Sequence, residues 1–225
     1  ALNMAGFLFT GSDTGGFGCD TTEDLMIRWL QYSLFTPLFR NHSADGTRLQ
    51  ELYQFDNIAS AAEMIKIRYA LIPYLYSEFL KAALNDEMMF RPLAFDFPED
   101  NTAKQVEDQL FLGNELMIAP IYKQNAQGRY VYLPEEMMMI SMKSVSDYTA
   151  AVLPAGHHYV EAPLDTLVFF IRKGKAIPFG AAADNTSQID MSALRLRGYE
   201  GSTYELYSDN GYSPEPEDSL KITTL

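Results

Sequence analysis

A glycine-rich loop holds the first candidate for chemistry in this sequence. Residues 11–18 read Gly-Ser-Asp-Thr-Gly-Gly-Phe-Gly and place one carboxylate, Asp13, among glycines. Glycines permit tight turns and close approach of a ligand, and the ring of Phe17 could face a sugar or a base. A phosphate loop is disfavoured, because the dinucleotide-binding and P-loop spacings are absent and Asp13 would repel phosphate. The alternative to a functional loop is a plain turn.

The second candidate is the run Arg40-Asn41-His42, which ends an apolar stretch. Arg and Asn present fixed hydrogen-bond donors, and His either donates or accepts, so the group suits a ligand rich in hydroxyls. The alternative is a structural loop in which Arg40 pairs with a carboxylate and His42 caps the backbone. A single His beside an Arg makes no catalytic dyad, so spacing alone favours that structural interpretation.

Three further features suggest metal or thiol chemistry and are set aside. His157 and His158 are adjacent, so in a strand they would point to opposite faces, and we expect no metal site there. The run 209–211 (Asp-Asn-Gly) resembles a piece of a calcium loop, but the remaining ligand spacing is missing, which indicates a tight turn. The only cysteine, Cys19, allows no internal disulfide and is expected to be structural or incidental.

The elements that position the two candidate loops follow from the apolar pattern. Residues 1–10 (ALNMAGFLFT) predict a buried strand. Asp13 would then lie where a loop leaves the C-terminal end of a strand, the rim that holds the active site in α/β barrels. A helix follows, with N-cap residues at 20–22 and an end before Pro37. Apolar residues at spacings of three and four predict a second, longer helix within 57–85.

From residue 86 onward the pattern becomes that of strands, so the first third is strand plus helix and the rest is all β. We expect a domain boundary near Glu87 and a weaker one in the small and polar stretch 180–187. The run of methionines at 137–139 is interpreted as gap-filling core. Strands are expected at 88–97, 115–122, 129–133, 158–161, 166–173, 194–198 and 203–207.

Composition excludes several classes of protein. The 225 residues are 47% hydrophobic and 21% charged, as in an ordinary globular protein. The net charge of −13 would repel a phosphate backbone and an anionic lipid surface, so neither nucleic acid nor a membrane is an expected partner. The longest apolar runs are too short to span a bilayer. A single cysteine favours a reducing compartment, and we expect a cytoplasmic protein.

These motifs also resemble a known family. Gly-Ser-Asp-Thr-Gly-Gly-Phe, then 25–39 (LMIRWLQYSLFTPLF), then Arg-Asn-His, is similar to the end of the barrel domain of glycoside hydrolase family 31, which comprises α-glucosidases and α-xylosidases. Further motifs follow in the order of that family, over nearly the whole chain. They are 68–77 (RYALIPYLYS), 90–93 (FRPL), 109–120 (QLFLGNELMIAP), 131–134 (VYLP), 162–165 (APLD), 170–174 (FIRKG) and 204–211 (YELYSDNG).

The resemblance implies a fold and a domain division. The last elements of a (β/α)8 TIM barrel would occupy 1–87, a proximal β-sandwich domain 88–180, and the start of a distal β domain 181–225. The sequence departs from the family pattern at 135–143 (EEMMMISMK), where an aromatic-rich strand is usual.

The resemblance also implies roles for single residues. Asp13, Arg40 and His42 would bind the non-reducing terminal sugar, with Phe17 on the wall of that subsite. The family is retaining and uses a carboxylate nucleophile and a carboxylate acid/base. Both lie in motifs upstream of the glycine-rich loop, Trp-x-Asp-Met-Asn-Glu and Gly-Asp, and this sequence contains neither string. We therefore assign no catalytic residue to this chain and do not move Asp13 into that role.

The function expected from the resemblance is the C-terminal part of a retaining α-glucosidase that hydrolyses terminal α-linked glucose from oligosaccharides. The chain would need no metal or cofactor and would be inactive alone. Its partners would be an oligosaccharide or small α-glucoside, the remainder of the same enzyme and, in a homo-oligomer, further copies of the chain. The alternatives are an α-xylosidase or transglycosylase of the same family, and a non-catalytic carbohydrate-binding or scaffold protein. Because residues 1–10 already resemble core sequence and lack an initiator Met, we expect a longer parent protein.

Overall fold

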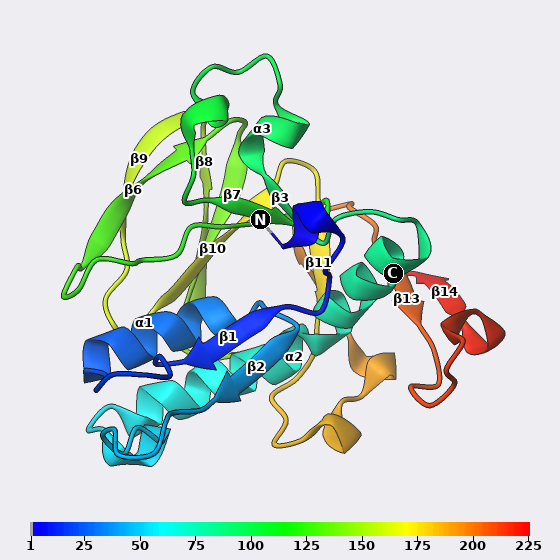
Figure 1. Ribbon diagram of the computed structural model, residues 1–225. Coiled ribbons are helices and arrows are strands. Elements are labelled where there is room, and N and C mark those ends of the chain that lie inside the picture. Colours follow the sequence, from blue (N-terminus) through cyan, green and yellow to red (C-terminus); the bar gives the residue numbers. More distant parts are fainter. Residues whose placement is uncertain (1) are drawn as a thin grey trace.

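The computed structural model describes residues 2–225 and begins with a strand–helix–strand–helix unit. Strands β1 (Gly11–Thr14) and β2 (Leu38–Asn41) are parallel neighbours, connected through helix α1 (Glu23–Ser33) and followed by helix α2 (Ile58–Leu84). Figure 1 shows the two strands lying beside the two helices, below the larger group of strands. This order is that of the end of a TIM barrel, as predicted.

Local sequence explains where α1 begins and ends. The Thr22 side chain accepts a hydrogen bond from the Leu25 amide at 3.2 Å, and two acidic residues occupy the first turn. Both features stabilise a helix N-terminus. Met26 and Leu30 are buried on the core side, and Pro37 follows the helix. The predicted helices at 22–37 and 57–85 are thus confirmed.

The predicted strand at 1–10 is wrong over the residues that the structure describes. A single 3-10 turn covers Asn3–Ala5, and regular strand structure begins only at Gly11. Phe7 and Phe9 are 64% and 68% exposed, so the apolar pattern does not report burial within this chain. Residues 2–10 form no strand because, among residues 2–225, no strand lies beside them to supply hydrogen bonds. Strand β1, in contrast, pairs with β2 over four residues.

The rest of the chain forms a β-sandwich and two smaller strand pairs. An antiparallel six-stranded sheet has the order β3-β4-β5-β10-β7-β8, and β6 pairs with β9 to form the opposing layer. Two further pairs, β11-β12 and β13-β14, contact α2. The strands are β3 (Phe90–Pro92), β4 (Leu110–Leu112), β5 (Leu116–Ile118), β6 (Gly128–Leu133), β7 (Met137–Met142), β8 (Tyr148–Leu153), β9 (Gly156–Glu161), β10 (Leu167–Arg172), β11 (Ala176–Phe179), β12 (Arg195–Gly198), β13 (Glu205–Ser208) and β14 (Lys221–Thr224).

Side chains of the six-stranded sheet alternate between two cores, as a strand period of two requires. Phe111, Met117 and Phe170 pack with residues of β6 and β9 inside the sandwich. Their neighbours Leu112 and Ile171 lie on the other face and join the core around α1 and α2. The predicted β-sandwich is therefore confirmed, and one sheet serves both cores.

Several strand predictions need correction. The expected strand at 88–97 is only β3, because residues 93–96 form a helical turn, α3 (Leu93–Asp96). Gly113, Asn114 and Glu115 form a three-residue turn between β4 and β5. Strands β2, β4, β7, β8, β11 and β14 were not predicted, and β1 lies in the segment that was expected to be a loop. The predicted boundaries near 87 and 180 stay a prediction. No helix in the described range is both long and apolar enough to cross a membrane.

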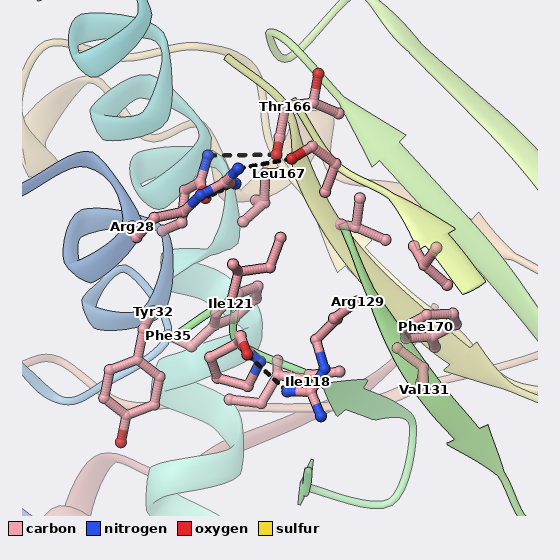
Figure 2. A pocket seen from close by; sticks show the side chains of 16 residues that line it. Arg28, Tyr32, Phe35, Ile118, Ile121, Arg129, Val131, Thr166, Leu167 and Phe170 are labelled. Carbon is pink, nitrogen blue, oxygen red and sulfur yellow. Dashed lines mark hydrogen bonds between the residues drawn. The ribbon is translucent and has the colours of Figure 1, made fainter. Parts of the chain in front are cut away.

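Helix α1 is fixed to the sandwich by a buried arginine. Figure 2 shows Arg28 pointing from α1 toward the strands, with Tyr32 and Phe35 on the same side of the helix. Arg28 Nη2 donates to the carbonyl oxygens of Ala126 and Ala162, each at 2.7 Å, and the residue is only 4% exposed. These charged hydrogen bonds span 98 and 134 residues of sequence and join the barrel end to the sandwich.

Candidate sugar-binding site

The register of the two parallel strands brings Asp13 and Arg40 together. They are paired across β1 and β2, and Arg40 Nε donates to Asp13 Oδ1 at 2.6 Å. His42 follows Arg40 by two positions, so both side chains project to the same side of the sheet. His42 Nδ1 lies 3.2 Å from the second carboxylate oxygen, Asp13 Oδ2. One carboxylate thus holds both side chains at the C-terminal ends of the strands.

Phe17 completes the cluster. Its ring centroid lies 5.2 Å from that of His42, with 37° between the ring planes, and the side chain is half exposed. The structure therefore brings together all four residues that the sequence singled out. The structural interpretation of Arg40 predicted an ion pair with a carboxylate. This ion pair is present, and its carboxylate is that of Asp13.

Exposure and charge make this cluster available to a ligand. The Asp13 side chain is 17% exposed, whereas those of Arg40 and His42 are 51% and 50% exposed. The Arg40 guanidinium that donates to Asp13 holds the pKa of this carboxyl below its usual value. Asp13 is therefore ionised at neutral pH and can accept from ligand hydroxyls. The two half-exposed side chains beside it supply N–H donors.

The glycines after Asp13 are required by backbone shape. Gly15 and Gly16 have φ of +94° and +93°, the left-handed region that residues with a Cβ rarely adopt. A Cβ on Gly15 would also lie 2.4 Å from Met26 Cε, at the packed base of α1. The loop can therefore turn back over the helix only with glycine at these positions, and this turn carries Phe17 to His42.

Two amides, Asn41 and Gln50, hold the loops together, and only Asn41 was singled out from the sequence. The Gln50 side chain is buried, and its Nε2 donates to the carbonyl oxygens of Gly16 at 3.0 Å and His42 at 3.4 Å. Asn41 Nδ2 donates to Thr14 O at 3.3 Å and to Gln50 O at 3.1 Å. A single Gln in an irregular segment has no pattern, and only the fold brings it beside both loops.

The helix side of β1 carries a different environment. Ser12 points away from Asp13, and its Oγ accepts from Trp29 Nε1 at 3.0 Å. A cavity of about 570 Å³ lies there, lined by residues of α1, by Ser12 and by the segment 120–124. This cavity touches the neighbour of Asp13 and not the cluster itself.

The features set aside from sequence take ordinary structural roles. His157 packs on the Tyr132 ring at 4.9 Å, and His158 Nε2 donates to Pro154 O at 2.8 Å. Asp209 Oδ1 accepts from the Gly211 amide at 2.9 Å, as in a tight turn. Among residues 2–225, no three His, Cys, Asp or Glu side chains gather as a metal site would require.

Comparison with known proteins identifies the family. The family model "Glycosyl hydrolases family 31 TIM-barrel domain" matches residues 1–78, and "Glycosyl hydrolase family 31 C-terminal domain" matches 86–177. Alpha-glucosidase 2 of Bacillus thermoamyloliquefaciens is 34% identical over 98% of this chain and 28% of its own length. Lysosomal alpha-glucosidase of Mus musculus is 33% identical over 94% of this chain and 24% of its own length.

Solved structures give the same result. The family 31 dextranase of Flavobacterium johnsoniae, solved with glucose, matches with a TM-score of 0.82 and 26% identity over 99% of this chain and 28% of that chain. The family 31 alpha-xylosidase of Xanthomonas citri matches with a TM-score of 0.76 and 26% identity over 90% of this chain and 22% of that chain. The chain spans only 28% and 24% of the two curated relatives. It belongs to glycoside hydrolase family 31.

Proposed function

We propose that this chain is the C-terminal part of a retaining α-glucosidase that hydrolyses terminal α-linked glucose from oligosaccharides. The observation that carries the proposal is the convergence of Asp13, Phe17, Arg40 and His42 at the C-terminal ends of β1 and β2. The names of the bacterial and mouse relatives, both alpha-glucosidases, support the choice of substrate.

The chemistry of the cluster suits a terminal glucosyl unit. Such a unit is uncharged and presents a ring of hydroxyls. The ionised Asp13 accepts from two of them, while His42 and Arg40 donate to others and Phe17 packs against the ring. Each charged hydrogen bond of this kind contributes roughly 1.5 to 3 kcal/mol. These contacts fix the orientation of the sugar, which is a large part of catalysis by positioning.

Bond cleavage is assigned to the remainder of the enzyme. A retaining glycosidase needs two carboxylates about 5 Å apart, one as nucleophile and one as acid/base. We place both upstream of this chain, because the two carboxylate motifs of the family, Trp-x-Asp-Met-Asn-Glu and Gly-Asp, are absent from this sequence. The remainder of the same enzyme is then the principal partner, and a homo-oligomer and a cytoplasmic location are further proposals. The reaction needs neither a metal nor an organic cofactor.

The test uses the full-length enzyme and two chromogenic substrates. We expect 4-nitrophenyl α-glucoside to be hydrolysed with a higher kcat/KM than the α-xyloside, and NMR to show the α-anomer of glucose as the first product. A preference for the xyloside would favour an α-xylosidase, the alternative that similar xylosidase structures support. Transfer of glucose to a second sugar in place of water would indicate a transglycosylase. No turnover of either substrate would favour a non-catalytic binding protein.

A further inference from the structure

The sandwich carries a second group of side chains suited to carbohydrate, on strands β6 and β9. Tyr130 and Tyr159 are 71% and 55% exposed, and Tyr122, on the segment beside them, is 65% exposed. Exposed aromatic side chains that gather in one place are typical of binding surfaces. Figure 1 shows β6 and β9 side by side at the outer edge of the molecule. Val131 and Val160, the neighbours of the two tyrosines, are in the sandwich core, so Tyr130 and Tyr159 lie on the opposite, exposed face of this strand pair.

The tyrosines surround one cavity. Tyr130 and Tyr159 are paired across β6 and β9, and their ring centroids lie 5.3 Å apart with the planes at 71°. Together with Tyr122 they line a cavity of about 380 Å³. The near-perpendicular rings form an aromatic corner of this cavity.

Fixed polar groups line the same cavity. Asp108 Oδ2 accepts from Arg129 Nη2 at 2.7 Å and from the Tyr122 hydroxyl at 2.9 Å. Arg129 Nη1 also donates to Pro120 O at 2.6 Å, and its side chain is only 14% exposed. The carboxylate and the guanidinium are thus held in place before any ligand arrives, while the Asp108 side chain stays 38% exposed. Such preorganised groups lose little entropy on binding.

We propose that this surface, the tyrosine corner formed by Tyr122, Tyr130 and Tyr159 with Asp108 and Arg129, binds an oligosaccharide chain. A pyranose ring has a C–H face that packs on an aromatic ring and equatorial hydroxyls that meet carboxylate and guanidinium groups. The opposite charges of Asp108 and Arg129 are already paired, which suits an uncharged ligand. The choice of an α-glucan rests on the proposed function; binding of a sugar chain by the corner does not.

The experiment measures binding with the Asp13 cluster disabled. In full-length enzyme carrying Asp13→Asn, we expect maltoheptaose to bind saturably in titration calorimetry. Adding Tyr130→Ala and Tyr159→Ala should weaken this binding by about tenfold or more. The matched control is Tyr212→Ala, an exposed tyrosine that is 94% exposed and does not line the cavity, and it should leave the Kd unchanged. Circular dichroism and thermal denaturation establish that the variants fold.

A second readout separates this proposal from the proposed hydrolysis. With Asp13 intact, the double tyrosine variant should hydrolyse 4-nitrophenyl α-glucoside as the wild type does and degrade a long α-glucan several-fold more slowly. If no sugar is hydrolysed but maltoheptaose still binds through the tyrosines, the proposed function fails and the tyrosine corner stands. Equal binding of maltoheptaose by the double variant would overturn the corner. A change in oligomeric state in that variant, without a change in sugar binding, would assign the surface to protein contact and also overturn it.

Discussion

Truncation of His42 tests the proposed sugar contacts with little risk to the fold. The side chain is half exposed, contacts Asp13 at 3.2 Å and packs on Phe17, while its backbone carbonyl is held by the buried Gln50. His42→Ala therefore removes a ligand hydrogen bond and leaves the loop attached. A hydrogen bond involving a charged group contributes roughly 1.5 to 3 kcal/mol, and about 1.4 kcal/mol is one decade in rate. We expect kcat/KM for 4-nitrophenyl α-glucoside to fall roughly ten- to a hundredfold.

The matched control is His157→Ala, because His157 is an exposed histidine that packs on Tyr132 in the sandwich and lies outside the cluster. It should keep the wild-type kcat/KM, and both variants should keep the wild-type Tm to within about 2 °C. Wild-type kcat/KM in a correctly folded His42→Ala enzyme would refute the assignment of this imidazole to the substrate. A fall in Tm that accounts for the lost activity would instead make His42 a structural residue.

Three more predictions follow. Gly15→Ala should lower the free energy of unfolding by about 1 to 3 kcal/mol and raise KM. The control Gly46→Ala, at a φ of +83° with open space around it, should lower the free energy of unfolding less. Equal losses of unfolding free energy for the two variants in urea denaturation would contradict the predicted clash of a Cβ at position 15 with Met26 of α1. Burial and the charge of Glu78 raise the pKa of Glu115 to about 7, so folding takes up a proton between about pH 4.5 and 7 and wild-type stability falls across that window as pH rises. Glu115→Gln removes this pH-dependent loss of stability, so the variant should be more stable than the wild type by about 3 kcal/mol at pH 8 but not at pH 4.5. A difference in stability that does not change with pH would contradict this prediction. The 225-residue chain alone should show no turnover of an α-glucoside, and measurable turnover would contradict the upstream placement of the carboxylates.

Local signals were enough for the helices, whereas the grouping of the site residues came from the family resemblance. Thr22 and Pro37 bracket α1 because capping and the missing proline donor act within one turn. Spacing alone favoured a structural loop for Arg40 and His42, and the resemblance grouped them with Asp13. The structure brings Asp13 and Arg40 to one rim because parallel strands joined by a helix align their C-terminal ends. The helices therefore follow from short-range rules, whereas the cluster depends on the topology that the chain shares with its family.

The features that sequence did not predict depend on distant contacts. Gln50 is recognisable only when the fold brings it beside Gly16 and His42. Residues 2–10 have a strand-like pattern but no neighbouring strand among residues 2–225, and pairing, not pattern, decides strand formation. Strand β7 consists mostly of Met, a residue that fits strands and helices alike, and it forms because β10 and β8 pair with it on both sides.

The most direct test of the account is a crystal structure of the full-length enzyme with glucose bound. We predict two glucose hydroxyls within about 3.2 Å of the Asp13 carboxylate, a third hydrogen-bonded to His42, and the ring of Phe17 against the sugar. Glucose bound elsewhere in the barrel, with the Asp13, Arg40 and His42 side chains contacting only one another, would contradict it.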